Sequence, residues 1–146
     1  MVAKNKGGRP SGDKTRCGGR WTEAKYNSFI KGTLRNACRR WGPIQDCIKD
    51  ARTRRGFYKC SCCGEEVPAT KIVTLKNGSK KRAKNIIVDH RDPIVPVTGF
   101  TTWDDCIERM FCEADNLDAI CYDCHQKKSA EEIAERAINR KGLKDE

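Results

Sequence analysis

The chain has 146 residues, with 30 Lys and Arg against 20 Asp and Glu, and a net charge of +10. Its length predicts one domain with an appendage. No apolar run approaches the roughly 20 residues of a membrane span, which excludes an integral membrane protein. The first twenty residues lack the apolar segment of a secretory signal, so a cytoplasmic protein is expected. In that compartment the ten cysteines favour metal ligands or free thiols over disulfides.

Positive charge is concentrated in the first part of the chain. Residues 1–59 hold sixteen Lys and Arg and four Asp and Glu, a net charge of +12, whereas residues 60–146 have a net charge of −2. An excess of this size in one part favours contact with a polyanion, and nucleic acid is the expected one. The alternative is a solvated charged surface without a partner.

Two segments are expected before residue 57. Residues 1–20 are rich in Gly, Lys and Arg and predict a flexible basic arm. Residues 21–56 predict a basic helical module of two helices. Thr22 is a candidate N-cap of the first helix, and Pro43 suits the first turn of the second.

The side chains of this module divide into core and surface. The helical spacing of Tyr26 and Phe29 places these aromatic rings in a core rather than in contact with bases. Arg35 and Arg39 lie on the other faces and are candidate nucleic-acid contacts. The cysteines outside the motifs described below are interpreted as small core residues: Cys17, Cys38, Cys47, Cys106 and Cys112.

Residues 57–146 predict a small α+β domain. A strand is expected over 67–75, and Asn77-Gly78 is a strong turn signal. The basic loop that follows includes Lys81 and Arg82, which are candidate DNA contacts. A second strand over 86–88 leads directly to Asp89 and His90.

Three further elements complete this domain. A short helix over 103–111 is expected, with Thr101 or Thr102 as its N-cap. A strand follows over 117–120. The last helix is expected from Tyr122 to about residue 140.

Two Cys-x-x-Cys motifs, Cys60-x-x-Cys63 and Cys121-x-x-Cys124, predict a structural zinc site. Two residues between cysteines allow one tight turn to direct both thiolates at the same ion, and two such turns complete a tetrahedral four-cysteine shell. Cys62 offers the alternative spacing Cys60-x-Cys62, but Cys63 gives the same spacing as the second motif. The other interpretation is a cluster of buried free thiols.

The two histidines of the chain stand beside other groups with catalytic potential. His90 follows Asp89 at the end of a predicted strand, His125 follows Cys124, and Asn116 lies just ahead of the strand over 117–120. A neutral imidazole can take a proton from water, and a divalent ion held by oxygen and nitrogen ligands can stabilise charge on a phosphate. The combination favours phosphodiester hydrolysis. The alternative is a zinc-ribbon scaffold whose histidines are only hydrogen-bonded.

These residues, placed between two Cys-x-x-Cys pairs, resemble the HNH endonuclease family with its ββα-metal fold. The most specific stretch is residues 116–128, Asn-Leu-Asp-Ala-Ile-Cys-Tyr-Asp-Cys-His-Gln-Lys-Lys, and the resemblance covers residues 57–130. The loop with Trp103-Asp104-Asp105 and Phe111-Cys112 is similar to HNH proteins of tailed bacteriophages. Phage origin would place the protein in the host cell cytoplasm.

The resemblance implies a role for each residue of the set. His90 would be the general base, and Asp89 and His125 would hold one Mg²⁺ or Mn²⁺, giving 3′-hydroxyl and 5′-phosphate products. Asn116 would either bind the metal or brace the loop and orient the base. Three basic residues beside the site are candidate phosphate clamps: Arg91, Lys127 and Lys128.

The leading hypothesis is a metal-dependent DNA endonuclease. Two other classes stay open, a non-catalytic zinc-stapled nucleic-acid adaptor and an RNA-directed nuclease. Phage proteins of this kind act either as homing-type nicking enzymes or beside the genome-packaging machinery. One small site cuts one strand, so a double-strand cut would require a homodimer.

Overall fold

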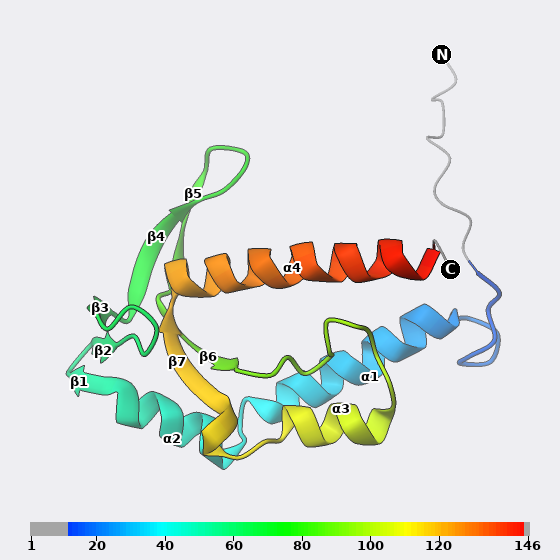
Figure 1. The fold of residues 1–146 in the computed structure, drawn as a ribbon, viewed down its shortest axis with the longest axis horizontal. Helices are drawn as coiled ribbons and strands as arrows, with labels where there is room; N and C mark the ends of the chain where they lie inside the picture. Colours follow the sequence, from blue (N-terminus) through cyan, green and yellow to red (C-terminus); the bar gives the residue numbers. More distant parts are fainter. Residues whose placement is uncertain (1–11, 145–146) are drawn as a thin grey trace. The chain divides into compact units, whose positions relative to one another are not determined.

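The computed structural model describes residues 12–144, which form an α+β structure of small sheets and helices (Figure 1). Residues 1–11, the first part of the predicted arm, lie outside the described range, as do residues 145–146. The chain divides into two compact units between Ala37 and Cys38. None of the helices within 12–144 has both the length and the apolar character that crossing a bilayer requires.

The first unit contains a closed turn followed by α1 (Glu23–Cys38), of which only the last residue belongs to the second unit. Arg16 and Trp21 pair as a β-bridge, so residues 16–21 are not the open arm that composition predicts. Thr22 caps α1 as predicted, because its Oγ1 accepts a hydrogen bond from the Lys25 amide at 3.2 Å.

Aromatic and basic side chains share the surface of this unit. The rings of Trp21 and Phe29 lie 5.1 Å apart, and the Arg16 guanidinium lies 4.3 Å from the centre of the Tyr26 ring. Phe29 is 56% exposed, so the prediction that it belongs to a core is wrong. Between residues 12 and 37, the described part of the first unit, no second helix or sheet is present against which this face of α1 could pack. Cys17 is also exposed, at φ 54°, and is not a core residue.

The second unit is built around an antiparallel strand pair that leads into a long helix. Strands β6 (Ile86–His90) and β7 (Leu117–Cys121) pair with Ile86 opposite Cys121 and His90 opposite Leu117. Helix α2 (Gly42–Ala51) lies against both strands, and α4 (Tyr122–Lys144) begins at the residue after β7. The buried side chains include Cys38, Ile86, Cys106, Met110, Leu117, Ala119 and Ile120.

The connection between β6 and β7 carries α3 (Trp103–Met110) and the short 3-10 helix η1 (Ala114–Asn116). Thr102 is the N-cap of α3, and its side chain accepts a hydrogen bond from the Asp105 amide at 3.1 Å. The sequence located α3 to within one residue, whereas α4 continues four residues beyond its predicted end.

Two further sheets precede β6. Strands β1 (Arg52–Arg54), β2 (Phe57–Lys59) and β3 (Glu66–Pro68) form one antiparallel sheet. Strands β4 (Thr70–Thr74) and β5 (Lys80–Lys84) form a separate hairpin.

The single strand predicted over 67–75 is two strands, β3 and β4, because the backbone changes partner at Ala69. The Ala69 amide donates to the Gly56 carbonyl at 2.9 Å, and the Ala69 carbonyl accepts from the Asn85 amide at 2.9 Å. Neither bond belongs to the ladder of β3 or β4. The predicted turn at Asn77-Gly78 is confirmed, with Gly78 in the left-handed region at φ 83°.

Candidate metal centre and adjoining polar site

A tight turn after β2 presents the first pair of thiols. The Gly64 amide donates to the Cys60 carbonyl and the Cys60 amide to the Glu65 carbonyl, both at 2.9 Å. Gly64 has φ 74°, a conformation that glycine adopts without steric cost. The Ser61 amide donates to the Ala119 carbonyl at 2.9 Å, which fixes the turn beside β7.

The predicted four-cysteine cluster is present. One Sγ atom from each of Cys60, Cys63, Cys121 and Cys124 lies within 4.8 Å of the others. Cys60 and Cys121 are buried, and the exposed Cys62 is not one of the four. Four converging thiols suit the tetrahedral shell of zinc, with bonds of about 2.3 Å, so the cluster could hold such a metal ion.

The backbone around the cluster favours an ionised Cys60. Burial raises the pKa of its thiol, but amide hydrogen bonds outweigh this effect and lower the pKa to about 6. Two of them come from the Cys63 and Cys121 amides, at 3.5 and 3.2 Å from the sulfur. By contrast, the hydrogen bond to the Cys121 thiol, together with burial, raises the pKa of Cys124. A bound divalent cation would allow all four thiols to ionise together.

His90 lies at the end of β6 and is held by α3. Its Nε2 is 2.9 Å from the carbonyl oxygen of Met110, the last residue of α3. The last four carbonyls of a helix have no partner within the helix, which leaves this one available. Met110 is fully buried, and its carbonyl also accepts a bond from Cys38 Sγ at 3.2 Å.

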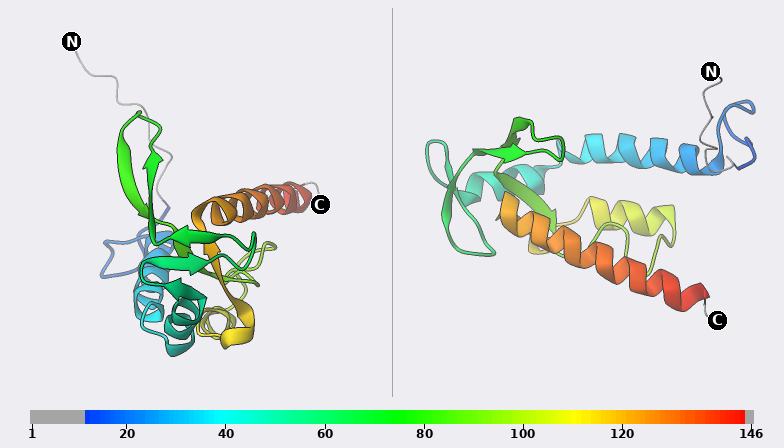
Figure 2. Two further views of the ribbon diagram at one scale, coloured as in Figure 1. Left: turned by 90° about the vertical axis from the view of Figure 1, so that its left-hand side faces the viewer. Right: turned by 90° about the horizontal axis from the view of Figure 1, so that it is seen from above.

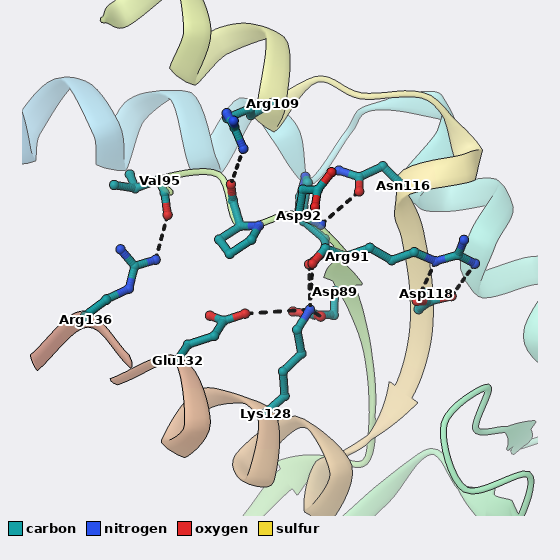
Figure 3. A network of polar contacts seen from close by, with 12 residues as sticks. Asp89, Arg91, Asp92, Val95, Arg109, Asn116, Asp118, Lys128, Glu132 and Arg136 are labelled. Atoms are coloured by element: carbon teal, nitrogen blue, oxygen red, sulfur yellow. Dashed lines mark hydrogen bonds and ion pairs between the residues drawn. The ribbon is translucent and has the colours of Figure 1, made fainter. Parts of the chain in front are cut away.

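Lys128, one of the predicted phosphate clamps, reaches from α4 to the neighbouring carboxylate (Figure 3). Its ammonium group forms an ion pair with Asp89, and it donates to the carbonyls of His90 at 2.7 Å and Arg91 at 3.3 Å. Glu132, one turn further along α4, lies 3.7 Å from the same ammonium. The Lys128 side chain therefore ties the end of β6 to α4.

Asn116 braces the loop that follows His90. Its Oδ1 accepts a hydrogen bond from the Asp92 amide, and its backbone carbonyl accepts one from the Arg91 amide, both at 2.9 Å. Of the two roles expected for Asn116, these contacts match the bracing of the loop.

The rest of this loop is attached to α4 by its carbonyls. Arg136 donates to the carbonyls of Val95 and Pro96 at 2.6 and 2.9 Å. Asn139 donates to the carbonyl of Val97 at 3.0 Å. One face of α4 thus holds the loop backbone from residue 91 to residue 97.

Arg91, a second predicted phosphate clamp, forms a two-pronged ion pair with Asp118, at 2.8 and 2.9 Å. The hydrogen bond from Arg91 lowers the pKa of Asp118 below its ordinary value. Asp118 is the direct cross-strand partner of Asp89. Like charges opposite one another destabilise a sheet, and here each carboxylate has its own cation.

His125 lies in the first turn of α4, one turn before Lys128. Its Nδ1 is buried and has no hydrogen-bond partner among the described residues. A buried polar atom without a partner costs free energy and requires an explanation. Asp89 and His125 do not join a third His, Cys, Asp or Glu in a preformed cluster, since only the four cysteines do so within the described range.

The remaining predicted nucleic-acid contacts lie on the surface. Lys127 is exposed on α4, and Lys81 and Arg82 are exposed on β5. Arg35 on α1 and Arg39 just after it are also exposed.

Sequence reasoning missed how the polar site is held together. The hydrogen bond from His90 to Met110 joins residues twenty positions apart, and no local pattern signals it. A signal for the contacts of α4 did exist. Lys128, Glu132 and Arg136 follow one another at four-residue spacing, which places them on one face of a helix.

Comparisons with protein-family models, curated proteins and solved structures gave no match to this chain.

Proposed function

We propose that the protein is a metal-dependent DNA endonuclease of the HNH type. The observation that carries this proposal is the buried Nδ1 of His125, which has no hydrogen-bond partner within residues 12–144 and lies on the helix whose next turn contacts Asp89. A purely structural histidine would be expected to satisfy that nitrogen with a protein partner. The strand pair β6–β7 followed by α4 is the element order that the resemblance implies.

The contacts of His90 suit a general base. A carbonyl oxygen only accepts hydrogen bonds, so the Nε2 that faces Met110 must carry the hydrogen. In the neutral ring the lone pair then lies on Nδ1, and this nitrogen can accept a proton from water. The hydrogen bond to the Met110 carbonyl also keeps the imidazole ring in the same orientation before and after it gains that proton.

By the resemblance, Asp89 and His125 would hold Mg²⁺ or Mn²⁺: a carboxylate oxygen is a ligand that these ions prefer, and Nδ1 of His125 has no hydrogen-bond partner among residues 12–144. When bound, such an ion supplies positive charge to the phosphate and to the leaving oxygen. Lys128 is the protein's own cation at Asp89 and keeps that carboxylate beside the end of β6.

The proposed reaction is hydrolysis of one DNA strand. His90 Nδ1 takes a proton from water, and the water oxygen forms a bond to phosphorus. The bond from phosphorus to the 3′ oxygen breaks, and that oxygen takes a proton from a solvent water molecule, while His90 later returns its proton to solvent. The products are a 5′-phosphate and a 3′-hydroxyl.

A non-catalytic nucleic-acid adaptor stapled by a structural zinc ion is the second candidate. The ion pairs of Asp89 with Lys128 and of Asp118 with Arg91 favour it, because both carboxylates are already neutralised within the protein. This candidate leaves His125 Nδ1 unexplained.

Zinc-loaded protein incubated with supercoiled plasmid tests the proposal. Nicked or linear product is expected with Mg²⁺ or Mn²⁺ and not without added divalent ion. A single-stranded RNA substrate in parallel separates DNA cleavage from RNA cleavage. Plasmid binding with no product under any of these conditions would favour the adaptor.

A further inference from the structure

The β4–β5 hairpin concentrates positive charge in a part of the chain that is otherwise acidic. Residues 70–84 contain six Lys and Arg and no Asp or Glu. Residues 60–146 have a net charge of −2 in total, so outside the hairpin this part has a net charge of −8. Figures 1 and 2 show the hairpin extending away from β6, β7 and α4 within the second unit.

The register of the hairpin separates its cations between two faces. Thr70, Ile72 and Thr74 lie opposite Lys84, Arg82 and Lys80, whereas Val73 lies opposite Lys81. Side chains alternate between faces along a strand, so Arg82 and Lys81, predicted together as DNA contacts, point to opposite sides. We call Lys80, Arg82 and Lys84 the outer row.

The outer row faces solvent. All three of its side chains are exposed, and none forms an ion pair with any residue in the range 12–144. Ile72, on the same face, is 55% exposed, whereas Val73 on the other face is 8% exposed. The hairpin therefore has one partly covered face and one open face on which every charge is positive.

The base of the hairpin is fixed to the elements that carry the polar site. Lys71 forms an ion pair with Asp123 at 2.9 Å, in the first turn of α4 that also carries His125. The buried Asn85 accepts a hydrogen bond from the Tyr122 amide at 3.4 Å. Asn85 also connects β5 directly to β6, which ends at Asp89 and His90.

We propose that the outer row docks the hairpin in the major groove of duplex DNA beside the cleaved bond. The inference rests on the proposed function, for which it names the contact surface. A two-stranded ribbon fits the major groove of B-DNA, which is about 12 Å wide. Successive outer-row residues are about 6.8 Å apart along the strand, so each can contact a separate phosphate.

Two variants of equal charge test this assignment. Arg82→Gln with Lys84→Gln removes two charges from the outer row, and Lys76→Gln with Lys81→Gln removes two from the loop and the other face. Binding to a DNA duplex is measured by fluorescence anisotropy at several salt concentrations. Zinc content and thermal unfolding confirm that both variants fold.

The outer-row variant should lose roughly tenfold or more in affinity at about 0.1 M salt, and its salt slope should flatten by about 1.8, or 0.9 per contact. The matched variant should lose less than half as much binding affinity. Equal losses in the two variants, or an unchanged slope in the outer-row variant, would overturn the proposal. An RNA duplex should not distinguish the variants, because its major groove is too narrow for the ribbon. If it does distinguish them, the groove assignment is wrong.

Failure of this inference is distinguishable from failure of the proposed function. If the native protein cuts plasmid but the outer-row variant binds DNA normally, only the docking surface is wrong. If outer-row binding is confirmed and no condition gives cleavage, the endonuclease proposal fails, and the hairpin remains a DNA-binding surface without a cleaved bond beside it.

Discussion

Lys128 keeps together two carboxylates that would otherwise repel one another. It also donates to backbone carbonyls that would otherwise lack this hydrogen bond. Its ammonium group lies between Asp89 and Glu132 and donates to the backbone carbonyl of His90. Removing it would leave two carboxylates close together and free the loop beyond β6. Its neighbour Lys127 is exposed and provides a matched control.

Lys128→Met should destabilise the fold by about 1–3 kcal/mol, the range for hydrogen bonds to charged groups and their unsatisfied partners. Lys127→Met should change the free energy of unfolding by less than about 0.5 kcal/mol, as is usual for surface sites. Denaturant unfolding of both variants measures the difference. Equal stabilities would mean that the ion pair with Asp89 contributes nothing to the fold.

At the scale of elements, the cysteine cluster fixes the start of α4, and α4 in turn holds the loop after β6. The cluster joins the turn after β2 to the end of β7 and so determines where α4 begins. The polar face of α4 then holds the loop after β6 through Lys128, Arg136 and Asn139. Loss of the cluster should therefore disturb the polar site as well.

Cys124→Ser should abolish tight binding of one zinc per chain and lower the thermal unfolding temperature, because metal binding contributes to folding free energy. Cys62→Ser is the matched control, since Cys62 is an exposed thiol in the same turn outside the cluster of four. Elemental analysis after dialysis and thermal melts measure both effects. If Cys124→Ser keeps its zinc and its melting curve, the assignment of the cluster fails.

At the scale of the whole molecule, charge is divided between a basic first part and an acidic domain with a basic hairpin. Residues 1–11 alone contain three Lys and Arg and no acidic residue. Under the proposed function, such charges would contribute to DNA affinity by releasing counterions, independently of sequence.

Deleting residues 1–11 should flatten the salt dependence of DNA binding by up to about 2.7 in slope, or 0.9 for each charge that contacts a phosphate. The turn from Arg16 to Trp21 and the cap of α1 are retained in this variant. Binding isotherms at several salt concentrations measure the slope. An unchanged slope would assign this segment to solubility alone.

Local signals in the sequence predicted most elements of the fold and the cysteine cluster. Apolar spacing, Thr22 and Thr102 as caps, and Asn77-Gly78 as a turn are all short-range features. One of the errors arose where distant residues decide the outcome. Ala69 breaks a predicted strand because its partners are Gly56 and Asn85.

The polar site, too, could be predicted from the sequence only in part. Its residues could be named from the sequence, but their partners could not. The hydrogen bond between His90 and Met110 and the ion pair between Asp89 and Lys128 span twenty and thirty-nine positions.

The central claim is that His90 is the general base of a DNA endonuclease. Measuring DNA cleavage by the His90→Ala variant tests this claim most directly. Single-turnover cleavage of supercoiled plasmid with saturating Mn²⁺ should fall by about two orders of magnitude or more, the scale of a lost general base. DNA affinity should be nearly unchanged, because the phosphate contacts are assigned to Lys and Arg side chains, all of which this variant keeps. Cleavage at close to the native rate would contradict the assignment of His90 as the base and, with it, the proposed active site.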